Sequence, residues 1–79
     1  MLTKRLQSLI AEMLDLPEAE VTRDTRRADT GNWDSLNHLQ LVTAIEREFG
    51  VKLSMDEIAA INTAGNLQDI VASRSQRAG

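Results

Sequence analysis

Three residues able to take part in nucleophilic or proton-transfer chemistry lie close together near the middle of the chain. Asp34, Ser35 and His38 fall within five positions, and side chains three residues apart on a helix can touch. A serine hydrolase also needs an oxyanion hole and a substrate pocket, and nothing in the sequence supplies a second group of donors for them. We therefore expect no enzyme here. With one histidine and no cysteine, we also expect no metal site and no disulfide.

The other chemistry open to Ser35 is covalent modification of its hydroxyl group. The segment 31–36, Gly-Asn-Trp-Asp-Ser-Leu, ends a long polar stretch and begins a helical pattern. Ser35 then stands in the first turn of a helix, where free amides and the helix dipole favour a bound phosphate. Asp34 is a good N-cap for that helix because its carboxylate can accept the free amide hydrogens. A serine at a helix start projects from the domain, where a separate enzyme can reach it.

The elements that must hold Ser35 are helices. Apolar spacings of three and four residues predict an all-α fold, a small bundle of three main helices and one short helix. The predicted helices span residues 2–15, 34–49, 55–61 and 65–73, and a long loop, 16–33, joins the first two. Antiparallel helices need only a short connection, so a loop of this length predicts that the first two run roughly parallel. The 79 residues form one domain, 1–79, whose end, 72–79, should fray.

Local signals mark where several of these elements begin and end. Gly50 suits the left-handed position after a helix, and Ser54 with Glu57 forms a capping box for the short helix. In the long loop only Leu16, Val21 and Trp33 can anchor to a core. The apolar positions of the second helix cover roughly 220° of its circumference, wider than an ordinary buried stripe. We therefore expect Leu36 and Leu39 to be partly exposed, as a contact patch would be.

Charge and composition exclude several classes of function. The net charge is −3, which disfavours nucleic acid as a partner because phosphates need clustered Lys and Arg. No apolar run reaches the length of a membrane span, and the basic start lacks the apolar stretch of a secretory signal. We expect a cytosolic, monomeric protein without membrane insertion. A domain this small has no room for a deep cleft, which also disfavours an enzyme.

These features together resemble a known family. Asp34-Ser35-Leu36 resembles the phosphopantetheine attachment motif of acyl carrier proteins, usually Asp-Ser-Leu. Residues 41–51, read as Leu-Val-x-x-Ile-Glu-x-Glu-Phe-Gly-Val, are similar to the second helix of that family and the turn that follows it. The capping box, the Asp56-Glu57 pair and the segment 67–70, Leu-Gln-Asp-Ile, resemble the third and fourth helices. The resemblance covers nearly the whole chain.

The resemblance implies a carrier with a covalent 4′-phosphopantetheine arm. A phosphopantetheinyl transferase would move the arm from coenzyme A to the Ser35 hydroxyl, guided by Asp34 and using Mg²⁺ in its own site. Acyl groups would then be held as thioesters and presented to acyl-loading and acyl-processing enzymes of lipid, fatty-acid or secondary-metabolite biosynthesis. The residues expected to contact partners are Leu36, Asn37, Leu39, Glu46, Glu48, Asp56 and Glu57. The residues expected to line an acyl groove, or simply to form the core, are Val42, Ile45, Phe49, Leu53, Ile58 and Ile61.

The second helix also departs from the family pattern. It carries Asn37, Gln40 and Arg47 where acidic residues are common, and we expect His38 to lie at the surface or the groove edge. Since charge complementarity decides partner choice, we hypothesise a specialised pathway with its own partners. Trp33 before the motif resembles some free-standing carriers outside fatty-acid synthesis, so an aminoacyl or peptidyl carrier is an alternative. An unmodified helical interaction domain is a further alternative, from another class. A DNA-binding bundle is disfavoured because the second helix lacks a recognition array.

Overall fold

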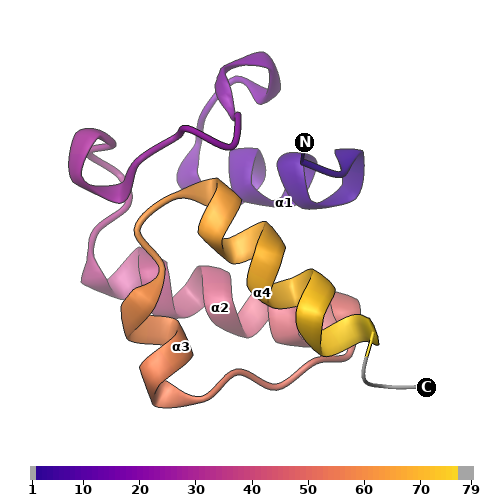
Figure 1. Ribbon diagram of the computed structural model, residues 1–79. Coiled ribbons are helices and arrows are strands. Elements are labelled where there is room, and N and C mark those ends of the chain that lie inside the picture. The colour runs from indigo at the N-terminus through magenta and orange to yellow at the C-terminus, as the bar shows by residue number, and fades with distance from the viewer. Residues whose placement is uncertain (1, 77–79) are drawn as a thin grey trace.

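The structure is a computed structural model that describes residues 2–76, with side chains to residue 74. Four α-helices account for most of that range (Figure 1). They are α1 (Lys4–Leu14), α2 (Ser35–Phe49), α3 (Met55–Ala60) and α4 (Ala64–Gln76). No β-strand occurs within the described residues. The predicted all-α bundle of three main helices and one short helix is therefore confirmed.

The last helix is longer than the sequence pattern predicts. It begins at Ala64 rather than residue 65 and continues through Gln76, so the prediction of a frayed end from residue 72 is wrong for 72–76. Burial of Val71 and an ion pair of Arg74 with Glu57 of α3 hold these last turns. Neither contact can be read from the polar sequence of that segment. Residues 77–79 of the predicted frayed end lie outside the described residues.

The first two long helices run antiparallel, so the prediction of a parallel pair is wrong. Arg5 at the start of α1 pairs with Glu48 near the end of α2, with 2.6 Å between Nη2 and Oε2. At the opposite ends, Asn32 just before α2 donates from Nδ2 to the Leu14 carbonyl at 2.9 Å. Figure 1 shows the same opposed directions, and α4 runs in roughly the direction of α2. The loop therefore has its length for a reason other than helix direction.

That reason is a detour of the loop across the start of α4. The loop contains two short 3₁₀ turns, Glu18–Glu20 and Arg27–Asp29, which the sequence analysis did not predict. Its expected anchors Val21 and Trp33 are buried in the core, and Leu16 packs against it. The loop supplies core side chains that a short hairpin connection could not provide.

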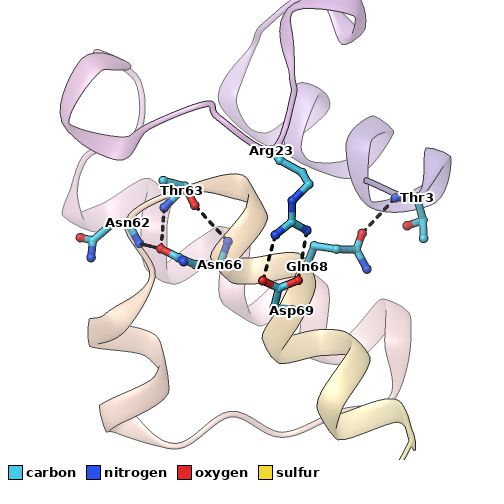
Figure 2. Close-up of polar contacts among 7 residues, drawn as sticks. All are labelled: Thr3, Arg23, Asn62, Thr63, Asn66, Gln68 and Asp69. Atoms are coloured by element: carbon cyan, nitrogen blue, oxygen red, sulfur yellow. Dashed lines mark hydrogen bonds and ion pairs between the residues drawn. The ribbon is translucent and has the colours of Figure 1, made fainter. Parts of the chain in front are cut away.

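Between those anchors, the loop backbone lies against the first turn of α4 (Figure 2). The amides of Ala64 and Gly65 donate to the carbonyls of Thr25 and Arg23 at 2.9 and 3.0 Å. The Arg23 guanidinium forms two hydrogen bonds with Asp69, which lower the pKa of that carboxyl. A Cβ atom at Gly65 would stand 3.0 Å from the Arg23 carbonyl oxygen. Glycine therefore permits this close approach.

Side-chain caps complete the start of α4, also drawn in Figure 2. The Asn66 amide donates to the Thr63 hydroxyl at 3.0 Å, and the Asn66 side-chain oxygen accepts from the amides of Thr63 and Asn62. Further along α4, Gln68 accepts from the Thr3 amide at 2.9 Å and so joins α4 to the start of α1. Amides that would lack partners at this helix start are thus satisfied.

The core lies between α1, α2 and α4, with contributions from the loop and the connections around α3. Its buried side chains are aliphatic apart from Trp33 and His38. The largest fully buried side chains are Leu6, Ile10, Leu14, Val21, Leu41, Ile45, Ile61 and Leu67. Within it, α2 contributes Leu41 and Ile45, so the inner face of the helix that begins at Ser35 is held by packing.

Gly50 ends α2 in the left-handed conformation, with φ of 65°, as predicted. Substitution by alanine places no atom in a crowded position, because nothing lies within 4 Å of the added Cβ. We expect Gly50→Ala to lower the free energy of unfolding by about 1 kcal/mol through backbone strain alone. Gly31→Ala is the matched control, since its Cβ is equally free and its φ is not left-handed. Chemical denaturation of both variants tests this, and equal stabilities would contradict it.

The pair Glu57–Arg74 joins α3 to α4 and predicts a pH dependence. The hydrogen bond from Arg74 Nε to Glu57 Oε2 is 3.1 Å long and, with the Ser54 amide, lowers the pKa of Glu57 below its ordinary value of 4.5. A lowered pKa contributes stability above the unfolded value that is lost as the pH falls through the folded value.

We therefore expect Glu57→Gln, which preserves the capping box, to be less stable than the natural protein at pH 7. The difference should shrink as the pH falls below 4.5. Thermal unfolding across pH 3–7 measures it. A stability difference that stays constant over that range would show that the carboxylate charge contributes nothing.

Candidate functional site

Ser35 is the first residue of α2 and is exposed to solvent. Asp34 precedes it in extended conformation and acts as the N-cap, its Oδ1 accepting the Asn37 amide at 2.8 Å. The predicted cap is therefore confirmed. The helix dipole and the amides at this end give the region around the Ser35 hydroxyl a partial positive charge.

The residues before Ser35 are fixed on both sides. The Trp33 amide donates to the Thr30 carbonyl at 2.9 Å, and the indole ring is 2% exposed. The Asn37 side chain donates from Nδ2 to the Asn32 carbonyl at 2.7 Å, across the start of the helix. The backbone that carries Ser35 is thus held in place while its side chain stays free.

His38 is buried, so the prediction that it lies at the surface or groove edge is wrong. Its side chain is 4% exposed and stands between the loop and α3. Trp33 Nε1 donates to His38 Nδ1 at 2.9 Å, and because the indole nitrogen only donates, Nδ1 must be an acceptor. The hydrogen of the neutral ring is then on Nε2, which donates to the Ile58 carbonyl at 2.9 Å.

These bonds also exclude a catalytic triad built from Asp34, Ser35 and His38. Both ring nitrogens of His38 are engaged with Trp33 and Ile58, and the Asp34 carboxylate accepts a backbone amide. No imidazole nitrogen is free to take a proton from the Ser35 hydroxyl. The arrangement can carry a group on Ser35, but it cannot activate the serine as a nucleophile.

Exposed apolar side chains lie in the first turns of α2 and α3. Leu36 is 65% exposed and Leu39 54% exposed, which confirms the expected exposure of both. Met55, the first residue of α3, is 78% exposed and was not among the predicted contact residues. A signal for it existed, because Met55 falls three positions before Ile58 at the exposed start of a capped helix. Exposed large apolar residues of this kind mark contact surfaces.

The predicted acidic contact residues are mostly engaged within the molecule. Glu46 accepts the Leu53 amide at 2.8 Å, Glu48 pairs with Arg5, and Glu57 pairs with Arg74. Asp56 is exposed in the first turn of α3. All four of these acidic residues were predicted to be available to partners, because contacts between distant segments leave no local pattern in the sequence.

The predicted groove residues split into two groups. Val42, Ile45, Leu53 and Ile61 are buried in the core, whereas Phe49 and Ile58 are half-buried at its edge. Arg5 stacks over the Phe49 ring at 4.9 Å from its centroid. An acyl chain among the buried four would require helices to separate, so the groove role stays a prediction.

A surface hollow that was not predicted from the sequence lies between α1 and the exposed face of α2. It has a volume of about 400 Å³ and is lined by Met13 of α1 and by Leu39, Gln40, Thr43, Ala44 and Arg47 of α2. The two helices approach each other along this line, and small side chains at Thr43 and Ala44 leave the space open. Leu39, one of the exposed apolar side chains, also lines the hollow.

Ser35 suits a covalent phosphodiester by its position. The side chain is exposed, Leu36 after it is exposed and Asn37 is half-buried, and the helix start favours negative charge.

In the part of the chain that the structure describes, no helix is long and apolar enough to cross a membrane.

Comparison with known proteins agrees with this geometry. The family described as "Phosphopantetheine attachment site" matches residues 4–71. A polyketide-8 synthase acyl carrier protein 2 of Streptomyces avermitilis is 32% identical over 71 residues, 90% of this chain and 82% of that protein. An acyl carrier protein of Saccharopolyspora erythraea is 27% identical over 67 residues, 85% of this chain and 70% of that protein.

The fold agrees as well. The solution structure of a holo acyl carrier protein from Geobacter metallireducens superposes with a TM-score of 0.83 and 27% identity. The superposition covers 94% of this chain and 85% of that one. The attachment-site family matches most of this chain, and acyl carrier proteins resemble it in sequence and in structure. This chain therefore belongs to the phosphopantetheine-binding acyl carrier proteins.

Proposed function

We propose that Ser35 is the residue that carries the phosphopantetheine arm of this carrier. The observation that carries the proposal is an exposed hydroxyl on the first residue of a 15-residue helix, beside a capping carboxylate. A transferase can reach that oxygen without unfolding any element. The phosphate formed there stands at the positive end of the helix dipole, which stabilises its charge.

The arm supplies a terminal thiol that holds the intermediate as a thioester, and the chain supplies position and contact. Trp33 and Asn37 hold the backbone at the attachment point. Leu36 and Leu39 supply exposed apolar surface on α2 next to it, where partner enzymes dock, and Met55 adds exposed apolar surface at the start of α3. Asn37 of α2 and Asp56 of α3 add polar contacts. The carrier makes and breaks no bonds itself; its partners are a phosphopantetheinyl transferase and the enzymes that load and process the bound group.

The bound group is an acyl chain of fatty-acid, lipid or polyketide-type biosynthesis rather than an aminoacyl or peptidyl group. The relatives from Streptomyces avermitilis and Saccharopolyspora erythraea are acyl carrier proteins, which supports this choice over the aminoacyl alternative. The protein acts as a cytosolic monomer. Phe49 and Ile58 are half-buried at the edge of the core and are the proposed groove residues that an acyl chain would reach first.

Loss of the Ser35 hydroxyl should abolish modification. Incubation with coenzyme A, Mg²⁺ and a broad-specificity transferase should add the mass of one phosphopantetheine to the natural protein and none to Ser35→Ala. Ser73→Ala, at an exposed serine of α4, is the matched control and should gain the full mass. Intact-mass spectrometry gives the result. A mass gain in Ser35→Ala would refute the assignment of the attachment residue.

Asp34 should contribute a cap and a charge that can be separated. Asparagine caps helices about as well as aspartate, so Asp34→Asn should keep stability within about 0.5 kcal/mol, whereas Asp34→Ala should lose about 1 kcal/mol. Asp34→Asn should still lower kcat/KM of the transferase by about tenfold or more, because hydrogen bonds to charged groups contribute about 1.5–3 kcal/mol. If the asparagine variant is modified at the natural rate, Asp34 is only a cap.

A further inference from the structure

One stripe of α2 begins beside Ser35 and is exposed along its length. Its members are Leu36, Leu39, Gln40, Thr43 and Arg47, all exposed, and we call them the α2 face. Spacings of three, four, seven and eleven residues place side chains on one side of a helix. Arg47 is twelve residues after Ser35 in the sequence, about 18 Å along the helix axis. A standard protein contact of about 800 Å² on each partner covers both.

The α2 face carries one charge, and it is positive. Its two acidic neighbours are engaged elsewhere: Glu46 accepts the Leu53 amide at 2.8 Å, and Glu48 accepts from Arg5 Nε at 3.0 Å. Among the side chains of residues 2–74, no ion pair involves Arg47. The protein as a whole has a net charge of −3, so this face has the opposite sign to the rest of the molecule.

The shape of the face matches its charge. The hollow of about 400 Å³ has Met13, Leu39 and Ala44 as apolar walls, and Arg47 is the one charged residue among those that line it. Such a site accepts an apolar side chain and rewards a carboxylate placed next to it. A lysine or arginine in that place would meet Arg47 and lose its hydration without gaining a partner.

From these observations we propose that the α2 face docks partner enzymes through an apolar side chain flanked by a carboxylate, and that Arg47 selects against enzymes with basic docking surfaces. The proposal rests on the proposed carrier function and adds the chemistry of the partner. Charge complementarity of this kind acts mainly on the association rate and fades at high salt.

The test uses a phosphopantetheinyl transferase with a basic docking surface, and a variant of it with a docking arginine changed to glutamate. Against the basic enzyme, Arg47→Glu should raise kcat/KM about tenfold at low salt, and the gain should vanish at about 1 M salt, where the screening length is about 3 Å. Against the acidic variant the order should reverse, the natural carrier being the better substrate. Reversal of both charges is needed to assign the effect to the contact itself.

Lys52→Glu is the matched control, because it changes the net charge equally at an exposed residue outside the α2 face. It should change kcat/KM by less than twofold with either enzyme. Circular dichroism verifies that Arg47→Glu folds. Arg47→Gln removes the charge without reversing it, so its kcat/KM should lie between those of the natural protein and Arg47→Glu.

Equal effects of Arg47→Glu and Lys52→Glu would overturn the proposal, as would a loss of rate in Arg47→Glu with the basic enzyme. In either case the carrier function would stand, because the arm is still attached. If no transferase modifies the natural protein at all, the carrier assignment of Ser35 fails first, and the inference about partners fails with it.

Discussion

Trp33 is the largest side chain of the domain, whose other aromatic residue is Phe49. Because Trp33 is buried, its neighbours must supply a hydrogen-bond acceptor for the indole N–H. A buried indole N–H needs an acceptor, because an unpaired donor in the core costs about 1–3 kcal/mol. His38 is that acceptor, and its other nitrogen donates to the Ile58 carbonyl. Three segments, the loop end, α2 and α3, are joined by these two hydrogen bonds. Residues 34–37, which include Ser35, lie between Trp33 and His38 in the sequence, so the hydrogen bond between these two residues helps to fix the backbone of this segment.

These hydrogen bonds hold the backbone around Ser35 in place and leave the Ser35 side chain exposed. Atoms that define the backbone around Ser35 are buried or paired, whereas the Ser35 side chain itself is exposed. A carrier needs this combination, because its own contribution is position: one fixed point of attachment that many enzymes can approach. The histidine near the serine is consistent with this, since both of its nitrogens are committed to the fold.

Several of the charged side chains form ion pairs between elements that are distant in the sequence. Long-range pairs link α1 to α2, the loop to α4, and α3 to α4. Surface pairs like these contribute little stability one by one. Their larger effect is on what the surface presents, because each pair removes a carboxylate from the charges that a partner would meet. Of the two glutamates of α2, Glu48 is paired in this way, whereas Glu46 accepts a backbone amide. The exposed α2 face itself carries a single charged residue, Arg47.

Much of this molecule follows from local sequence signals. Several features involve residues within a few positions of each other and were correctly predicted from the sequence. They are the helix periodicity, the caps at Asp34 and Ser54, and the turn at Gly50. The exposure of Leu36 and Leu39 was also correctly predicted, because too many apolar residues fall on one short helix to be buried together. The family resemblance rested on these same short-range features.

The tertiary structure alone decided how distant segments meet. The antiparallel course of α1 and α2, the path of the loop over α4 and the last turns of α4 follow from burial of side chains in the shared core. Ion pairs of Arg5, Arg23 and Arg74 with partners far away in sequence accompany these contacts. His38 was misplaced for the same reason, since a polar residue is assigned to the surface unless its partners are known. Local patterns record what a residue prefers, whereas burial and pairing depend on which neighbours the fold brings to it.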